Sequence, residues 1–192
     1  MSGVELAAVV TGYLLGALSP ATLVARQRGI DLRGVGSGNP GATNTVRALG
    51  PRMGVVVAVL DVLKGLLPAA GFGMLDHRAG LLAGVAAVLG HVTSPLLRGR
   101  GGKGVATAAG AILGSHPLWA PVVLLTWVVV LLLARWTALA SICAALSLLV
   151  VALVAGDDVL WAAALFVIVL VRHQPNLRRW FEARRTRRAL ET

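Results

Sequence analysis

The chain has 192 residues, of which 57% are apolar and only 14% are charged, against about 25% charged residues in an ordinary soluble domain. This composition leaves too little polar surface to cover a water-soluble protein, and its apolar content excludes an intrinsically disordered chain. The formal net charge of +10 comes from 18 Lys and Arg against 8 Asp and Glu. In a membrane protein such basic residues set topology in cytoplasmic loops and meet anionic lipid, so we expect no nucleic-acid partner.

Seven apolar stretches are candidates for helices that cross a membrane, because a spanning helix needs about 20 apolar residues. In chain order they lie at 4–25, 53–74, 79–97, 103–116, 117–134, 137–155 and 158–172. The fourth is the weakest, since at about 1.5 Å per residue it reaches only about 21 Å, and a re-entrant element is its alternative. The first stretch lacks a basic n-region and carries Glu5, so we expect a retained span rather than a signal peptide.

The distribution of basic residues orients these spans. Seven crossings place 16 basic residues on one side and only Arg78 on the other, while Lys64 lies inside a span. Because basic loops stay in the cytoplasm, the N-terminus is expected outside and the C-terminus inside. The sequence therefore predicts an all-α integral membrane protein of the cell membrane, with seven transmembrane helices over residues 1–180 and an Arg-rich cytoplasmic tail over 181–192.

The first polar segment on the expected cytoplasmic side, residues 36–44 (GSGNPGATN), has the composition of a phosphate-binding loop. Its three glycines allow backbone N–H groups to turn toward an anion. Candidate side-chain donors are Ser37, Asn39, Thr43, Asn44 and, beyond the loop, Arg47. A flexible turn is the alternative. A dinucleotide-binding loop is excluded, because no strand precedes the glycines.

The second polar segment, residues 98–110, places Lys103 between glycines at the start of an apolar helix. Free N–H groups at a helix N-terminus attract phosphate, and a lysine there adds a full charge. The segment is not a Walker A loop, since Gly104 follows the lysine where that motif needs Ser or Thr. An ordinary basic cytoplasmic loop is the alternative.

The third polar segment, residues 171–180, contains His173 and Asn176 at the inner end of the last span. Three residues apart, they share a face if the chain is helical there, whereas Pro175 between them is also compatible with a turn. An interfacial anchor that includes Trp180 is the alternative to a functional site.

Other polar residues give no separate chemistry. Asp61 and Lys64 lie at i and i+3 inside the second span, where an ion pair and a functional role are both open. His91 is interpreted as a buried structural histidine. The histidines are spread over both sides and Cys143 is the sole cysteine, so we expect no metal and no cofactor. Cations and amide donors favour phosphorylated substrates that carry their own activation.

Together, GSGNPGATN (36–44) with Arg47, GGKGVAT (101–107) and RHQPN (172–176) resemble the three signature loops of the bacterial acyl-phosphate:glycerol-3-phosphate acyltransferase family. LDVLKG (60–65) and LGH (89–91) are similar to segments between those loops. The similarity runs from about residue 10 to 180.

The resemblance implies a membrane enzyme of phospholipid synthesis that transfers a fatty acyl group from acyl-phosphate to the 1-hydroxyl of sn-glycerol 3-phosphate. It implies that glycerol 3-phosphate is held by Ser37, Arg47, Lys103, His173 and Asn176. It implies that the phosphate of acyl-phosphate is held by Asn39, Gly41, Thr43, Asn44 and Lys103. Lys103, Arg47 and His173 are the candidate catalytic residues, with His173 as a general base only in an alternative to proton uptake by the substrate phosphate. The enzyme that makes acyl-phosphate is an expected partner.

Two other function classes stay open at this point. A permease for an organic phosphate would share the phosphate-binding loops, although transporters usually place their sites at mid-membrane between repeats. A non-catalytic scaffold for lipid enzymes is the other alternative, but it leaves Lys103 among its glycines without a reason.

Overall fold

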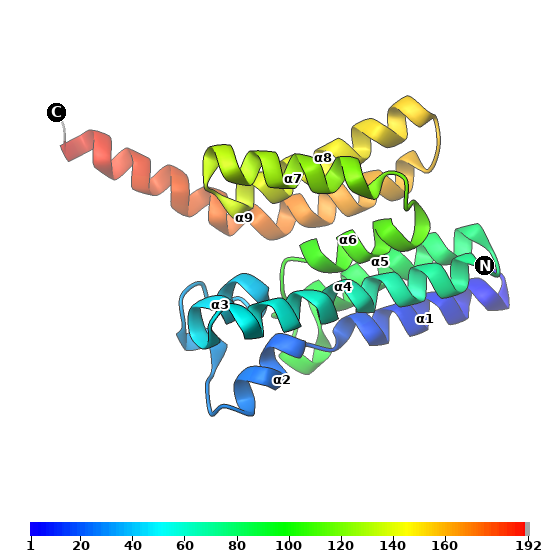
Figure 1. Cartoon of the computed structure of the whole chain (residues 1–192), viewed down its shortest axis with the longest axis horizontal. Coiled ribbons are helices and arrows are strands. Elements are labelled where there is room, and N and C mark those ends of the chain that lie inside the picture. Colours follow the sequence, from blue (N-terminus) through cyan, green and yellow to red (C-terminus); the bar gives the residue numbers. More distant parts are fainter. Residues whose placement is uncertain (191–192) are drawn as a thin grey trace. The chain divides into compact units, whose positions relative to one another are not determined.

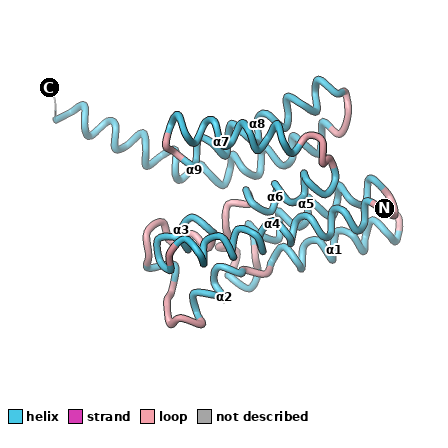
Figure 2. The backbone as a smooth tube through the Cα atoms, viewed as in Figure 1, coloured by secondary structure: helices cyan, strands magenta, loops and turns pink. Residues whose placement is uncertain are grey.

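The computed structural model describes the backbone of residues 1–190 and the side chains of residues 1–186 (Figures 1 and 2). Over this range every regular element is a helix and none is a strand, so the all-α prediction is confirmed. The chain forms two compact units, Met1–Pro121 and Val122–Thr192. The end of the predicted tail, residues 191 and 192, lies outside the described residues.

The first unit carries most of the polar loops. Its elements are α1 (Gly3–Ala17), α2 (Pro20–Arg26), the short 3₁₀ helix η1 (Leu32–Gly34), α3 (Ala42–Leu49), α4 (Pro51–Gly73), α5 (His77–Thr93), the 3₁₀ helix η2 (Pro95–Leu97) and α6 (Val105–Ser115). The second unit consists of most of α7 (Ala120–Ala134), then α8 (Thr137–Ala155) and α9 (Val159–Leu190).

Helices occupy all seven predicted apolar stretches. Five helical stretches have the length and hydropathy to cross a membrane: Gly3–Arg26, Pro51–Gly73, His77–Leu97, Thr137–Ala155 and Val159–Thr186. The two others, Val105–Ser115 and Ala120–Ala134, are shorter apolar helices. Three features differ from the sequence-based expectation. The first stretch, 4–25, is broken between α1 and α2, and α3 forms inside the polar segment after Gly41. In addition, α9 continues through Pro175 far beyond residue 172.

Large apolar side chains point outward along these helices. Leu67 on α4 is 61% exposed and Leu133 on α7 is 81% exposed. Monomeric soluble proteins rarely expose contiguous apolar surface of this kind, whereas lipid tails solvate it readily. The exposed leucines therefore fit helices that are surrounded by lipid.

Glycines set the close parallel packing of α1 on α5. A Cβ atom at Gly12 would overlap the backbone carbonyl of Ala83, and one at Gly16 would overlap that of Ala87. The contact continues to Gly90, whose backbone approaches Tyr13. In lipid the hydrophobic effect does not drive helices together, so this backbone approach supplies the van der Waals contact that holds the pair.

Close backbone approach at glycines also packs α4 against α6. A Cβ atom at Gly65 would overlap the carbonyl oxygen of Thr107, and one at Gly110 would overlap that of Val62. α4 and α6 run parallel, and α5, which connects them in the chain, runs in the opposite direction. The polar segments 27–41 and 98–104 therefore both lie at one end of the first unit (Figure 2).

The chain breaks between α1 and α2 at the same end. Pro20 cannot donate a backbone hydrogen bond and begins the new helix, while Ser19 caps it through Thr22. The break leaves the last carbonyls of α1 without helical donors. One of them, that of Ala17, accepts a hydrogen bond from the buried Ser94 hydroxyl at 2.6 Å.

We expect Gly65→Ala to lower the apparent unfolding temperature in detergent, because its new methyl group must push α6 away from α4. Overpacking of this kind costs about 1–3 kcal/mol. Gly71→Ala is the matched control on the same helix, since a Cβ there meets nothing within 4 Å. Equal unfolding temperatures for the two variants would contradict the packing described here.

Candidate active site

Asn44 shapes the first polar loop from inside. Its side chain is 2% exposed, and its amide donates hydrogen bonds to the carbonyls of Val35 at 2.9 Å and Leu32 at 3.2 Å. Its Oδ1 accepts the backbone N–H of Ser37 at 3.1 Å. These three bonds use the amide for the loop itself, so Asn44 determines where Ser37 lies.

Arg47 lies over the same loop. It follows Asn44 by one helical turn on α3, and a Cβ atom placed on Gly36 would lie 3.2 Å from Arg47 Cδ. Gly36 has a φ of 53°, a left-handed conformation that favours glycine. The exposed guanidinium of Arg47 is thereby kept next to Gly36.

An apolar cluster fixes this loop to the membrane helices. Ala21 and Ala25 of α2, Leu32 of η1 and Val57 of α4 are all buried against one another. Ala42 and Leu49 of α3 pack on the edge of this cluster. The glycine-rich residues are thus anchored by this core, which suits a loop that must present its N–H groups in a fixed direction.

The second loop is seated on the last turn of α5. Gly101 and Gly102 are buried, and a Cβ at Gly102 would overlap the ring of His91. The Gly102 N–H donates to the His91 carbonyl at 3.1 Å. Gly104, with a φ of 81°, then begins α6. Lys103 is therefore held, half-buried, immediately before a helix N-terminus, where an anion is favoured.

Beneath this loop lies a buried network of charged and polar groups. The Lys64 ammonium forms an ion pair with Asp61 at 2.9 Å and donates to the Leu18 carbonyl at 2.7 Å. His91 Nδ1 lies 3.5 Å from the same Asp61 oxygen. All three side chains are less than 10% exposed. The network connects α1, α4 and α5, and through His91 it contacts Gly101 and Gly102, which precede Lys103.

The two loops border a common cavity of about 510 Å³. It is lined by Thr22, Ala25, Arg26, Gly29, Ile30, Asp31, Leu32, Arg33, Gly38, Pro40, Leu97 and Arg100. Gly38 and Pro40 belong to the first polar segment, and Arg100 belongs to the second. The cavity thus borders both polar segments, but Ser37, Arg47 and Lys103 are not among its lining residues.

The third segment belongs to the second unit and lies on α9. His173 is 2% exposed, and its Nδ1 lies 2.8 Å from the Val169 carbonyl, which only accepts hydrogen bonds. Nδ1 therefore carries the proton, and in the neutral ring Nε2 carries the lone pair. Asn176 follows one turn later, with its Oδ1 accepting from Arg179 Nη2 at 3.2 Å. Of the two conformations open for Pro175, the helix is the one present.

Stacked aromatic rings support this part of α9. Trp180 stacks on Trp136, just before α8, with ring centroids 5.1 Å apart. The Arg184 guanidinium lies 4.1 Å over the Trp180 ring. A cation–π contact of this kind stabilises the helix end that follows His173 and Asn176 by about 0.5–1 kcal/mol at an exposed position.

The structure places the predicted residues in three groups. Ser37, Asn39, Gly41, Thr43, Asn44 and Arg47 form one continuous loop and helix, Lys103 lies on a second loop of the same unit, and His173 and Asn176 share one face of α9. The roles of these residues toward substrate stay predictions. The link from Asp61 through His91 to the glycines before Lys103 was not anticipated. Its signal in the sequence was a histidine and an acid at membrane depth, each of which costs free energy unless it is partnered.

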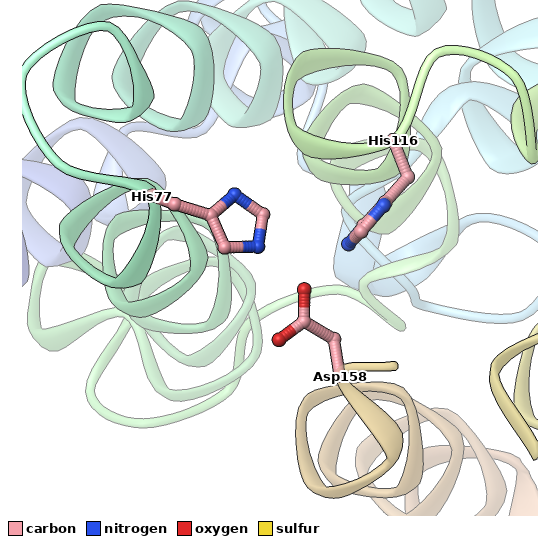
Figure 3. A group of neighbouring side chains, drawn as sticks. All are labelled: His77, His116 and Asp158. Carbon is pink, nitrogen blue, oxygen red and sulfur yellow. The ribbon is translucent and has the colours of Figure 1, made fainter. Parts of the chain in front are cut away.

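At the opposite end of the first unit, two histidines meet. His77 begins α5 and His116 ends α6, and their ring centroids lie 5.5 Å apart in an edge-to-face arrangement (Figure 3). His116 also stacks on Trp119 at 3.8 Å. Two imidazoles fall short of the three or four protein ligands of a zinc site, so this pair carries no metal assignment.

Comparison with known proteins identifies this arrangement. The sequence profile of the family described as "Glycerol-3-phosphate acyltransferase" matches residues 6–183. A glycerol-3-phosphate acyltransferase of Aquifex aeolicus is 40% identical over 186 residues, covering 93% of this chain and 96% of the relative. A relative of the same description from Thermus thermophilus is 41% identical over 177 residues, covering 89% of this chain and 88% of the relative.

Solved structures agree. The crystal structure of PlsY, an integral membrane glycerol 3-phosphate acyltransferase, in its glycerol 3-phosphate form has a TM-score of 0.88 at 39% identity, covering 95% of this chain and 94% of that one. Its lysophosphatidic acid form has a TM-score of 0.86 at 37% identity. The fold and loops described above are thus those of a multi-pass helical membrane enzyme. The chain belongs to the glycerol-3-phosphate acyltransferase family, and the predicted family and enzyme class are confirmed.

We expect Asp61→Asn to destabilise the protein in detergent, because it leaves the Lys64 ammonium buried without its carboxylate. Breaking one side of a buried ion pair costs about 3–5 kcal/mol. Adding Lys64→Met to the same variant removes the stranded charge and should raise the unfolding temperature again. A double variant that is less stable than the single one would contradict a structural ion pair.

Proposed function

We propose that this enzyme transfers a fatty acyl group from acyl-phosphate to the 1-hydroxyl of sn-glycerol 3-phosphate, giving lysophosphatidic acid and inorganic phosphate. The observation that carries the proposal is the pair of glycine-rich loops, each with a cation, at one end of the first unit. The two ligand forms of PlsY differ by one acyl group and support the same acceptor and product. Membership of an acyltransferase family sets aside the permease and the scaffold.

The residues of the two loops fit a donor that is already activated. Acyl-phosphate is a mixed anhydride, so the enzyme needs to bring two anions together and to stabilise the charge that develops on the carbonyl and the leaving phosphate. Arg47 and Lys103 offset the repulsion between the substrates. Ser37, Arg47, Lys103, His173 and Asn176 are assigned to glycerol 3-phosphate, and Asn39, Gly41, Thr43 and Lys103 to the phosphate of the donor.

In the proposed step, the 1-hydroxyl oxygen attacks the carbonyl carbon of the donor. A new ester bond forms, and the bond from the carbonyl carbon to the phosphate oxygen breaks. The hydroxyl proton passes to the departing phosphate. His173 is the alternative acceptor, since the Nδ1 bond to Val169 leaves the lone pair of a neutral ring on Nε2. Asn44 acts through the loop that it holds, by fixing the backbone N–H of Ser37.

We infer a seven-span arrangement in the inner membrane, with the N-terminus outside and the C-terminus and active site at the cytoplasmic face. Five helical stretches satisfy the length and hydropathy of spans, and α6 and α7 supply the two shorter crossings. The distribution of basic residues supports this orientation. No cofactor enters the proposed step, and a separate enzyme is expected to deliver acyl-phosphate.

The proposal is tested with purified protein in detergent, given acyl-phosphate and labelled glycerol 3-phosphate. We expect labelled lysophosphatidic acid and one phosphate for each acyl group transferred, without any membrane gradient. The controls replace acyl-phosphate with acyl-coenzyme A or with acyl carrier protein that carries the acyl group as a thioester. Equal turnover with either thioester would contradict acyl-phosphate as the donor.

For Lys103→Ala we expect turnover to fall about 100-fold or more, as when one transition-state donor is removed, while the folded protein remains extractable. Arg52→Ala is the control, because it removes an exposed cation from the first turn of α4 at the same end of the unit. Initial rates with both substrates saturating provide the comparison. Wild-type rates for Lys103→Ala would exclude it from phosphate binding in the reaction.

A further inference from the structure

The cavity between α2, η1 and η2 is lined in part by three arginines that the proposed step does not use. Arg26 comes from the end of α2, Arg33 from η1 and Arg100 from the segment after η2. All three are exposed, and Asp31 is the one acidic residue among the lining residues. Cations from three separate segments thus converge on a single hollow with a net charge of +2.

The ion pair inside the cavity leaves most of this charge uncompensated. Arg33 Nε lies 3.6 Å from Asp31, and both side chains are more than half exposed. Exposed pairs of this kind contribute about 0–1 kcal/mol. The Asp31 carboxylate also accepts the Arg33 backbone N–H at 3.0 Å, so its main role is to cap η1.

The walls connect this hollow to the predicted site. Gly38 and Pro40 of the first signature loop are among the lining residues. Gly38 packs closely on the backbone of Arg33, since a Cβ there would lie 3.2 Å from the Arg33 carbonyl oxygen. An anion in the cavity would therefore lie against the loop that carries Ser37 and Asn39.

The chemistry of the lining selects a phosphate. Guanidinium groups bind phosphate oxygens through paired N–H donors, and a positive hollow raises the local concentration of a dianion. The cavity volume of about 510 Å³ lies within the range of small-ligand sites. Its apolar lining residues, Ala25, Ile30, Leu32 and Leu97, suit the carbon skeleton that a phosphate monoester carries.

We propose that the cavity lined by Arg26, Arg33 and Arg100 binds a phosphate monoester next to the catalytic loops, as a site separate from Ser37, Arg47 and Lys103. The inference rests on the proposed function for its choice of ligand. The phosphate monoester is either soluble glycerol 3-phosphate on its way in or the headgroup of lysophosphatidic acid on its way out. Both carry the same group, and the experiment separates them.

The test compares the double variant Arg26→Gln/Arg100→Gln with Arg28→Gln. Arg28 is exposed on the same segment but does not line the cavity, and its Nη2 lies 3.9 Å from Met53 Sδ. For a soluble ligand we expect the KM for glycerol 3-phosphate to rise about three- to tenfold at low salt with kcat within about twofold of wild type. At about 0.5 M salt the difference should vanish, because exposed charges are then screened. For a lipid ligand, we expect the KM for glycerol 3-phosphate to stay unchanged and the inhibition constant of added lysophosphatidic acid to rise about three- to tenfold instead.

Direct binding separates this inference from the proposed reaction. Labelled glycerol 3-phosphate and inorganic phosphate are measured by equilibrium binding to the Lys103→Ala protein, and lysophosphatidic acid in mixed micelles forms a further arm. Loss of binding in any arm with Arg26→Gln/Arg100→Gln, but not with Arg28→Gln, supports the site even if acyl transfer itself is not observed. Unchanged KM, unchanged product inhibition and unchanged binding in all arms would overturn it, as would an equal effect of Arg28→Gln.

Discussion

A single buried ammonium group organises the first unit. Lys64 lies inside the membrane-spanning part of α4, where an unpaired charge is very costly. It is compensated by the Asp61 carboxylate and by the Leu18 carbonyl, which the break between α1 and α2 has freed from helical hydrogen bonding. His91 lies against the same carboxylate and supports the glycines before Lys103. The position of the loop that carries Lys103 therefore depends on three helices meeting around one charge.

Much of the fold could be predicted from the sequence because lipid imposes simple constraints. Runs of apolar residues must be helical where no water can satisfy the backbone, and the seven stretches at 4–25 through 158–172 all contain helices. The break at Ser19 and Pro20 and the continuation of α9 through Pro175 were harder to predict. Proline ends one of these helices and is accommodated in the other, and only the surrounding packing decides between the two outcomes.

The residue types of the candidate site could be predicted from the sequence, but which of its side chains hold the loops in place could not. Glycines, Ser37, Arg47 and Lys103 indicate a phosphate-binding surface by their chemistry alone. That Asn44 uses its amide to bind Leu32, Val35 and Ser37 depends on the fold of a loop with no repeating pattern. The contact of His91 with Gly102 joins residues on different elements, which no local periodicity encodes.

The break after Ala17 also constrains the order in which the protein is assembled. The carbonyls that it exposes are satisfied by Ser94, which follows α5, and by Lys64 of α4. Both donors are synthesised later than the segment that needs them. Until these donors are in place, the carbonyls of Ala17 and Leu18 need another hydrogen-bond partner such as water. The hydrogen bonding of the earliest helix is therefore completed only by segments that follow it in the chain.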